Sequence, residues 1–365
     1  MAAIVSSLRL LRLCAVRNVQ LAELNLHSTL NIIHGKNGSG KTSILEAIHL
    51  LASGKSFRSS KTSPLISTDA DQLTIYAETQ KSQRISLKKQ RSRASEMKLD
   101  LEIQKNWDSI ARLLPILVLD ASSFLLLEGG PRSRRRFLDW GVFHVEHNFL
   151  NHWRTTRKCI ANRNQLLKSS QLDKEQLAAW DKEFCLASGS VDLSRKHYFD
   201  RFLPVFQKTY QNLAADGGVE SVTLEYNRGW DKNIPLEEVL LGCFKNDLRY
   251  GATQHGPHRA DISFKVGKLP AIDVLSRGQQ KLLVSALKIA QGRIFSEVIS
   301  DECIYLVDDL PAELDGENRE KVLQELLGLN SQLLVTCVEL SSVERCLKIS
   351  SEASTFHVER GRITG

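Results

Sequence analysis

Long apolar runs are absent from this 365-residue sequence. The densest run, at 113–119, contains Pro115 and is far shorter than the roughly 18 to 20 apolar residues that a membrane-spanning helix needs. The seven cysteines form no Cys-x-x-Cys motif, and their odd number argues against a disulfide framework. These absences exclude a membrane-spanning protein, a disulfide scaffold and a zinc knuckle, and they favour a reducing cytoplasm.

The composition is that of a folded globular protein. Hydrophobic residues make up 42% and charged residues 25% of the chain, which disfavours disorder. At about 150 residues per domain, the length predicts two or three lobes, or one large domain with an insertion. The net charge of +7 favours an acidic partner, such as nucleic acid or an anionic membrane surface.

A glycine-rich loop interrupts the strand pattern near the N-terminus. Apolar and polar residues alternate over 8–34 and predict strands, and apolar residues recur at helical spacing after the loop. The loop matches G-x-x-x-x-G-K-[ST], in which backbone N–H groups wrap phosphates, the lysine neutralises the β and γ phosphates, and the threonine hydroxyl binds Mg²⁺. We therefore predict a nucleotide site formed by Gly35, Lys36, Asn37, Gly38, Ser39, Gly40, Lys41 and Thr42, with Thr42 also a metal ligand.

Two acidic residues follow an apolar stretch near the C-terminus. Residues 303–307 predict a buried strand that leads directly into Asp308 and Asp309. Phosphate sites of open α/β sheets lie at the carboxyl ends of the strands. We predict that Asp308 binds Mg²⁺ and that Asp309 orients or deprotonates the attacking water, so both are candidate catalytic residues.

A third segment, at 275–281, precedes a long predicted helix. Ser276 and Gln279 have the spacing of a capping box, which is one explanation of the pattern. A serine hydroxyl, a glycine that admits close approach and a helix N-terminus together also make an anion site. The segment alone does not decide between these two interpretations.

Taken in chain order, these segments resemble the head of ABC-type ATPases, with 275–279 similar to the signature and 313–315 similar to the D-loop. The resemblance implies an ATP-driven dimer in which each head completes the other's nucleotide site. It makes Ser276, Gly278, Gln279 and Asp315 candidate nucleotide-binding residues. The segment between Thr42 and Ser276 is too short for the long coiled-coil arms of SMC proteins, so the insertion must be a compact arm.

Three further segments, at 54–58, 131–139 and 256–261, are similar to the RecF family of bacterial recombination-repair ATPases. The resemblance implies an α/β fold, with an ABC-type P-loop head at 1–122 and 251–365 interrupted by a mainly helical arm at 123–250. It also implies that Arg58 contacts phosphate or adenine. The implied activity is ATP-dependent binding of single-stranded, gapped and double-stranded DNA, with RecR, RecO and RecA as partners.

Two rival functions stay open from the residues alone: the ATPase subunit of a transporter, and a structural DNA protein with a vestigial ATP site. The intact Lys41, Thr42, Asp308 and Asp309 disfavour a vestigial site. Because aspartate at 309 reaches less far toward a water than glutamate would, we expect slow, DNA-stimulated hydrolysis.

Basic clusters indicate where DNA would bind. The segment 81–98 contains seven basic residues and one acidic residue. A second set of basic residues, Arg154, Arg157 and Lys158, recurs at helical spacing. A solvated hairpin is the alternative explanation of the first cluster. Nothing in the clusters reads base identity, so we expect structure-selective binding through Lys88, Lys89, Arg91, Arg93, Arg134, Arg135, Arg154, Arg157 and Lys158.

Overall fold

The structure is a computed structural model that describes residues 4–5, 7–59, 61–214, 221–309, 314, 316–343 and 353–364. These residues form two compact units, the first within 1–124, 209–217 and 277–365, the second within 125–208 and 218–276. The predicted return to the head at 251 differs from this division, because 251–276 groups with the second unit. Strand pairing explains the difference: β11 (Asp261–Val266) pairs along its whole length with β10 (Val222–Asn227) of that unit.

A six-stranded sheet forms the base of the first unit, in the order β17-β16-β4-β15-β14-β9. All neighbours are parallel except the hairpin of β16 and β17. Every residue of β14 and β15 is buried, as expected for strands covered on both faces. The strands are β4 (Leu30–His34), β9 (Ile116–Leu119), β14 (Ile304–Val307), β15 (Gln332–Cys337), β16 (Ala353–Glu359) and β17 (Arg362–Thr364).

A second, antiparallel sheet includes strands predicted from the alternating pattern within 8–34. Its order is β3-β2-β5-β6-β7-β8. Buried and half-buried residues alternate along β5, so one face carries the core and the other faces solvent. The strands are β2 (Leu8–Val16), β3 (Val19–Asn25), β5 (Gln72–Thr79), β6 (Arg84–Gln90), β7 (Glu96–Leu99) and β8 (Glu102–Ile103).

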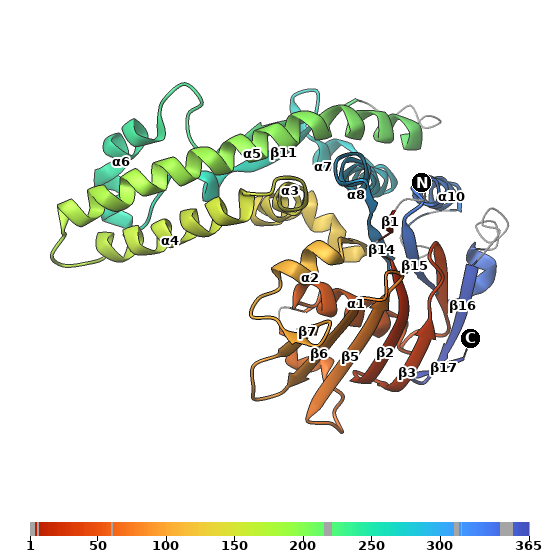
Figure 1. The fold of residues 1–365 in the computed structure, drawn as a ribbon. Helices are drawn as coiled ribbons and strands as arrows, with labels where there is room; N and C mark the ends of the chain where they lie inside the picture. The colour runs from red at the N-terminus through yellow and green to blue at the C-terminus, as the bar shows by residue number, and fades with distance from the viewer. Residues whose placement is uncertain are drawn as a thin grey trace. The chain divides into compact units, whose positions relative to one another are not determined.

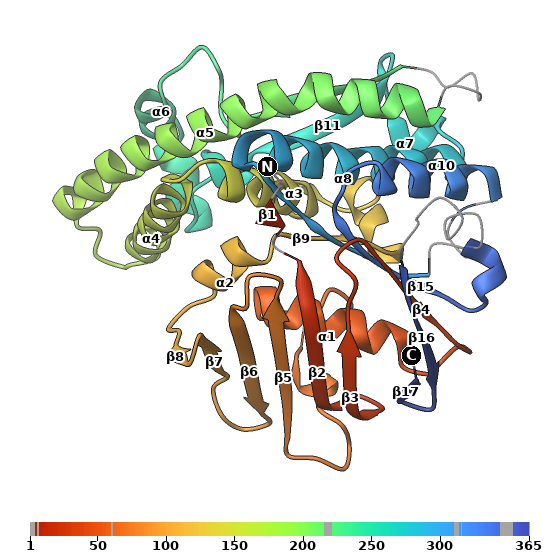
Figure 2. The same cartoon turned by 45° about the vertical axis from the view of Figure 1, so that its right-hand side comes forward.

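Helix α1 (Lys41–Ser53) joins the two sheets of the first unit into one core. Its Ile44, Ile48 and Leu51 are buried in a single cluster with residues of both sheets, among them Ile75 and Leu306. Figure 2 shows α1 running behind the antiparallel strands. The described part of this unit also contains the helices α2 (Asp108–Leu113), α8 (Arg277–Ile299) and α10 (Gly316–Leu327), and the short β1 (Ile4–Val5) pairs with β13 (Asp301–Glu302).

The second unit is mainly helical, as predicted. Its long helices α3, α4 and α5 are visible in yellow to green in Figure 1. They are α3 (Pro131–Val145), α4 (Phe149–Leu167) and most of α5 (Lys174–Ala214), accompanied by α6 (Leu236–Tyr250), the short α7 (Ala271–Val274) and a three-stranded sheet of β10, β11 and β12 (Leu269–Pro270). None of the helices in the described part of the chain is long and apolar enough to cross a bilayer.

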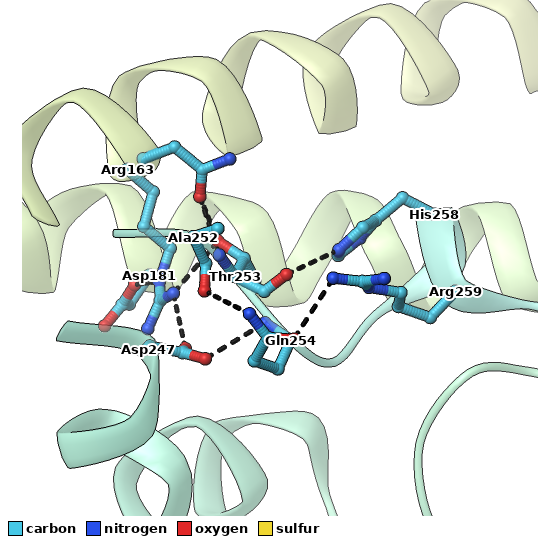
Figure 3. A network of polar contacts seen from close by, with 9 residues as sticks. Arg163, Asp181, Asp247, Ala252, Thr253, Gln254, His258 and Arg259 are labelled. Carbon is cyan, nitrogen blue, oxygen red and sulfur yellow. Dashed lines mark hydrogen bonds and ion pairs between the residues drawn. The ribbon is translucent and has the colours of Figure 1, made fainter. Parts of the chain in front are cut away.

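A buried arginine ties the helices of the second unit together (Figure 3). Arg163 of α4 is fully buried, and its guanidinium donates to Asp181 of α5 at 2.6 Å and to Asp247 of α6 at 2.7 Å. It also donates to the hydroxyl of Thr253 at 3.0 Å. The buried positive charge of Arg163 is therefore paired with two carboxylates, and such pairing is the condition under which burial of an arginine is tolerated.

The same network holds residues 256–259, which belong to the segment 256–261 that resembles the RecF family. His258 Nε2 lies 2.9 Å from the carbonyl oxygen of Thr253. Burial lowers the pKa of His258 to about 4, so the ring is neutral at pH 7 and its Nε2–H donates to that carbonyl. Arg259 stays exposed and donates to Gln254 at 3.1 Å.

Two glycines of the second unit give a matched test of its packing. A Cβ at Gly141 of α3 would overlap the ring and hydroxyl of the fully buried Tyr198, whereas a Cβ at the exposed Gly189 of α5 meets nothing within 4 Å. We expect Gly141→Ala to lower the free energy of unfolding by about 1–3 kcal/mol through overpacking. Gly189→Ala should raise it by about 0.5–1 kcal/mol, because alanine favours helix. Urea unfolding of both variants checks this, and a stabilised Gly141→Ala would contradict the packing described.

Candidate functional site

The glycine-rich loop lies between β4 and α1, as the sequence predicts. Gly35, Gly38 and Gly40 have φ values of 149°, 77° and 122°, which favour glycine. A Cβ at Gly35 would overlap the carbonyl oxygen of Val358, so this position also requires a close backbone approach. Gly40 caps α1 without a side-chain hydrogen bond, which leaves the helix N-terminus to an anion.

Two turns of other strand pairs hold this loop in place. The Asn18 side-chain amide, in the turn between β2 and β3, donates to the carbonyl oxygens of Gly38 at 3.1 Å and Ser39 at 2.9 Å. The backbone N–H of Gly361, between β16 and β17, donates to Ser39 at 2.8 Å. Sequence reasoning missed both residues, because turn residues carry no signal of a contact made across the fold.

Lys41 is buried with its charge directed at the loop. Its Nζ donates to the carbonyl oxygens of Gly35 at 2.6 Å and Lys36 at 3.1 Å. Only 6% of the side chain is exposed, and no described residue gives it an ion pair. A buried ammonium that is satisfied by carbonyl oxygens alone retains its full attraction for an anion. This arrangement suits the predicted contact with phosphate.

Thr42 and Asp308 meet, although 266 positions separate them in the chain. The hydroxyl of Thr42 donates to Asp308 Oδ1 at 2.9 Å, and the hydroxyl of Thr336 lies 2.8 Å from the same oxygen. Burial raises the pKa of Asp308, while the two hydroxyl groups and the charge of Arg58 partly lower it. Thr336 was not among the site residues predicted from the sequence.

The oxygen donors here fit the chemistry of Mg²⁺. Hydroxyl and carboxylate oxygens are the hard ligands that this ion prefers. Asp308 Oδ1 accepts two hydrogen bonds, whereas the described residues offer no donor to Oδ2. Asp308 is half-buried, and its Oδ2 is the atom best suited to a cation or to its bound water.

Asp309 follows in a strained backbone conformation. Its φ of 50° is left-handed, which is uncommon for a residue other than glycine. Its backbone N–H donates to the Thr336 hydroxyl at 2.8 Å. The described residues offer its carboxylate no hydrogen-bond donor, so the geometry is compatible with the predicted role on water, which stays a prediction.

A buried ion pair positions the loop that carries Arg58. Glu46 of α1 is fully buried and accepts two hydrogen bonds from Arg17, at 2.6 and 2.9 Å. Ser56 also donates to Glu46, and its hydroxyl accepts the backbone N–H of Arg58 at 3.0 Å. The side chain of Arg58 is exposed and its charge acts on Asp308. The sequence predicted Arg58 near the phosphates and did not identify the pair behind it.

The signature residues lie at the start of α8. Ser276 directly precedes the helix, and Gly278 and Gln279 belong to its first turn. A Cβ at Gly278 would meet nothing within 4 Å. The roles predicted for these residues require a second copy of the chain and remain predictions. Asp315 lies outside the described residues.

Three of the arginines predicted to contact DNA are engaged inside the chain. Arg134 donates to both carboxylate oxygens of Asp261, at 2.7 and 2.9 Å. Arg135 donates to the carbonyl oxygen of Ala260 at 2.7 Å, and Arg91 to that of Ser67 at 2.7 Å. These contacts give the three arginines a structural role. Arg91 is nevertheless exposed and Arg134 and Arg135 are half-exposed, so contact with DNA stays a prediction for all three. The other candidates are likewise exposed or half-exposed: Lys88, Lys89, Arg93, Arg154, Arg157 and Lys158.

Comparisons with known proteins agree with this geometry. A family model described as "RecF/RecN/SMC N terminal domain" matches residues 7–363. Proteins named "DNA replication and repair protein RecF" are similar throughout: that of Pseudomonas entomophila is 41% identical over 98% of this chain and 98% of its own. That of Stutzerimonas stutzeri is 42% identical over 98% and 97%.

Solved structures show the same fold. A structure titled "Structure of the recombination mediator protein RecF-ATP in RecFOR pathway" has a TM-score of 0.85 at 22% identity, covering 98% of this chain and 97% of that one. An SMC head bound to the C-winged helix domain of ScpA has a TM-score of 0.60 at 16% identity, covering 98% and 96%. The predicted α/β ATPase-head fold is thereby confirmed.

The Glu46 pair yields a stability prediction with an internal control. We expect Glu46→Gln to lower the free energy of unfolding by about 2 kcal/mol, because two charge-assisted hydrogen bonds to Arg17 are weakened in a buried setting. The exposed pair of Arg12 and Glu23 has the same chemistry, with side chains 54% and 51% exposed. Glu23→Gln should cost less than about 1 kcal/mol. Equal losses in urea unfolding would contradict a structural role for the buried pair.

Proposed function

This chain belongs to the RecF family, and we propose on that premise that it is an ATP-switched DNA-binding protein of DNA replication and recombinational repair. One observation carries the proposal. Lys41, Thr42, Asp308 and Asp309 come together where β4 and β14 end, and Thr42 and Asp308 are 2.9 Å apart. This is the location and the residue chemistry that nucleotide triphosphate sites of P-loop proteins require.

We assign the nucleotide contacts to residues 35–42. The backbone N–H groups of the loop and of the α1 N-terminus bind phosphate oxygens, and Lys41 exchanges its carbonyl partners for phosphate. Thr42 and Asp308 would hold Mg²⁺, which would supply positive charge beside the transferred phosphoryl group. Asp309 orients the attacking water. Its short side chain accounts for slow hydrolysis. ATP binding, more than the energy of its hydrolysis, then controls the state of the protein.

The switch requires two copies of the chain. We propose that Ser276, Gly278, Gln279 and Asp315 of one copy complete the nucleotide site of the other. The helix N-terminus of α8 supports this role, because it offers N–H donors to an anion. ATP would then close the dimer, and hydrolysis would reopen it.

The dimer would bind DNA through exposed cations. Arg157 lies with its guanidinium 4.8 Å from the ring centre of Trp153, and Lys158 with its ammonium 5.6 Å from that of Trp180. These contacts present rigid positive charges on α4. We propose single-stranded, gapped and double-stranded DNA as ligands, a cytoplasmic location, and RecR, RecO and RecA-like proteins as partners. Relatives at 41% identity over 98% of the chain are named for DNA replication and repair, and this disfavours a role as the ATPase subunit of a transporter.

Light scattering with and without MgATP tests the switch. We expect the wild type to shift from monomer to dimer with ATP and to bind DNA in the same transition. Ser276→Arg places a bulky cation in the signature, so it should bind a fluorescent ATP analogue as a monomer and fail to bind DNA. Lys41→Arg should slow hydrolysis.

The control is Ser221→Arg, which adds the same charge at an exposed position of the second unit. It should dimerise like the wild type. A wild-type protein that stays monomeric with ATP, yet binds DNA equally well without it, would refute the switch.

Salt dependence tests the DNA surface. The affinity for duplex DNA falls as salt rises, and each lost phosphate contact makes the slope of log affinity against log salt shallower by about 0.9. We expect this for two separate triple glutamine variants, one at Lys88, Lys89 and Arg93 and one at Arg154, Arg157 and Lys158. The control variant replaces cations that acids already neutralise: Arg12, Lys196 and Lys265. Unchanged slopes in both test variants would remove these surfaces from the proposal.

A further inference from the structure

Thr336 is a fully buried polar residue that follows three apolar residues of its strand. It is the penultimate residue of β15, and Leu333, Leu334 and Val335 precede it. The strand lies between β4, which leads into the phosphate loop, and β14, which leads into Asp308. Its side chain thus reaches the site from the strand that lies between the one leading to the phosphate loop and the one leading to Asp308.

The hydrogen bonds of Thr336 have only one possible direction. A backbone N–H can only donate, so the Thr336 hydroxyl oxygen accepts the hydrogen bond from Asp309, at 2.8 Å. The single hydroxyl proton is then left for Asp308 Oδ1, also at 2.8 Å. The hydroxyl group of Thr336 therefore donates to the carboxylate of Asp308 and accepts from the backbone of Asp309.

We propose that Thr336 is a positioning residue for ATP hydrolysis, which fixes both the carboxylate of Asp308 and the left-handed backbone of Asp309. This inference rests on the function proposed above. Together with Thr42, Thr336 holds Oδ1 of Asp308, so that Oδ2 is the oxygen left for a metal or its water. The bond to the Asp309 N–H secures the φ of 50°, which turns the chain at the point where the water-orienting carboxylate must leave the sheet.

A purely structural explanation accounts less well for a hydroxyl at this position. Valine has nearly the same shape and a stronger preference for strands, and it would match the apolar residues that precede it. Among the described residues, the hydroxyl group of Thr336 bonds only to Asp308 and Asp309. Its removal would leave a half-buried N–H and a carboxylate oxygen each with one partner fewer.

The test compares Thr336→Val, which removes the hydroxyl, with Thr336→Ser, which keeps it. Residues that orient metal ligands typically affect affinity or activity by 10- to 100-fold. We expect kcat for ATP to fall by about 10- to 100-fold in Thr336→Val, with KM changed by less than about 3-fold, and to stay within about 3-fold of wild type in Thr336→Ser. Thr336→Ala replaces the valine variant if that protein does not fold.

A second readout does not depend on turnover. The Mg²⁺ concentration that half-saturates binding of a fluorescent, non-hydrolysable ATP analogue should rise by about 10-fold in Thr336→Val and stay near wild type in Thr336→Ser. Thr79→Val is the matched control, because Thr79 is a buried threonine at the end of β5 whose hydroxyl accepts a hydrogen bond from the Gln83 N–H at 3.2 Å, outside the candidate site. It should leave both readouts unchanged.

Different failures are distinguishable. If the wild type binds the ATP analogue and Thr336→Val matches it in both readouts, the role of Thr336 is refuted and the proposed function stands. Equal losses in the serine and valine variants would assign the effect to packing of the methyl group and would also refute it. If the wild type binds no nucleotide, the proposed function and this inference fall together.

Discussion

Pairing between β4, β15 and β14 is the constraint on which the site depends, because it brings together residues that the chain keeps far apart. Leu334 lies opposite both Asn31 of β4 and Leu306 of β14, so the three strands share one register. A buried polar side chain ties the start of β15 to other segments of the first unit. The buried amide of Gln332 donates to the carbonyl oxygens of Leu8 at 2.7 Å and His27 at 2.8 Å, and accepts the Leu8 N–H. A slip of one residue would reverse the face of every side chain and separate Thr42 from Asp308.

The sequence predicted the parts of the site that are local in the chain. The glycine loop and the pair of acids after an apolar strand each carry their chemistry within a few residues. Asn18, Glu46 and Thr336 could not be identified in this way, because each acts through a partner that only the fold supplies. The fold class, the strands of both sheets and the helical insertion were predictable because hydrophobic periodicity is also a local property.

Charge patterns were the weaker guide for the same reason. Arg134 and Arg157 look alike in sequence, as arginines within basic clusters. Arg134 pairs with Asp261, 127 positions away, whereas Arg157 stays exposed beside Trp153. The boundary expected at 251 has a similar origin, since the alternation in β11 fits either unit and only its pairing with β10 decides. Long-range pairing, whether of charges or of strands, is what a single sequence leaves open.

The distribution of charges also separates the site from the rest of the fold. Elsewhere, two buried charges have opposite partners: Glu46 with Arg17, and Arg163 with Asp181 and Asp247. Among the described residues of the site, Lys41 has only carbonyl partners, and Asp308 accepts hydrogen bonds only from hydroxyl groups. Neither joins an ion pair with a described residue, although burying such charges unpaired is unfavourable. A ligand that carries both an anion and a cation would satisfy both groups at once, and a magnesium nucleotide has that composition. The site therefore holds a lysine and an aspartate that such a ligand would complete, and this links nucleotide binding directly to the stability of the first unit.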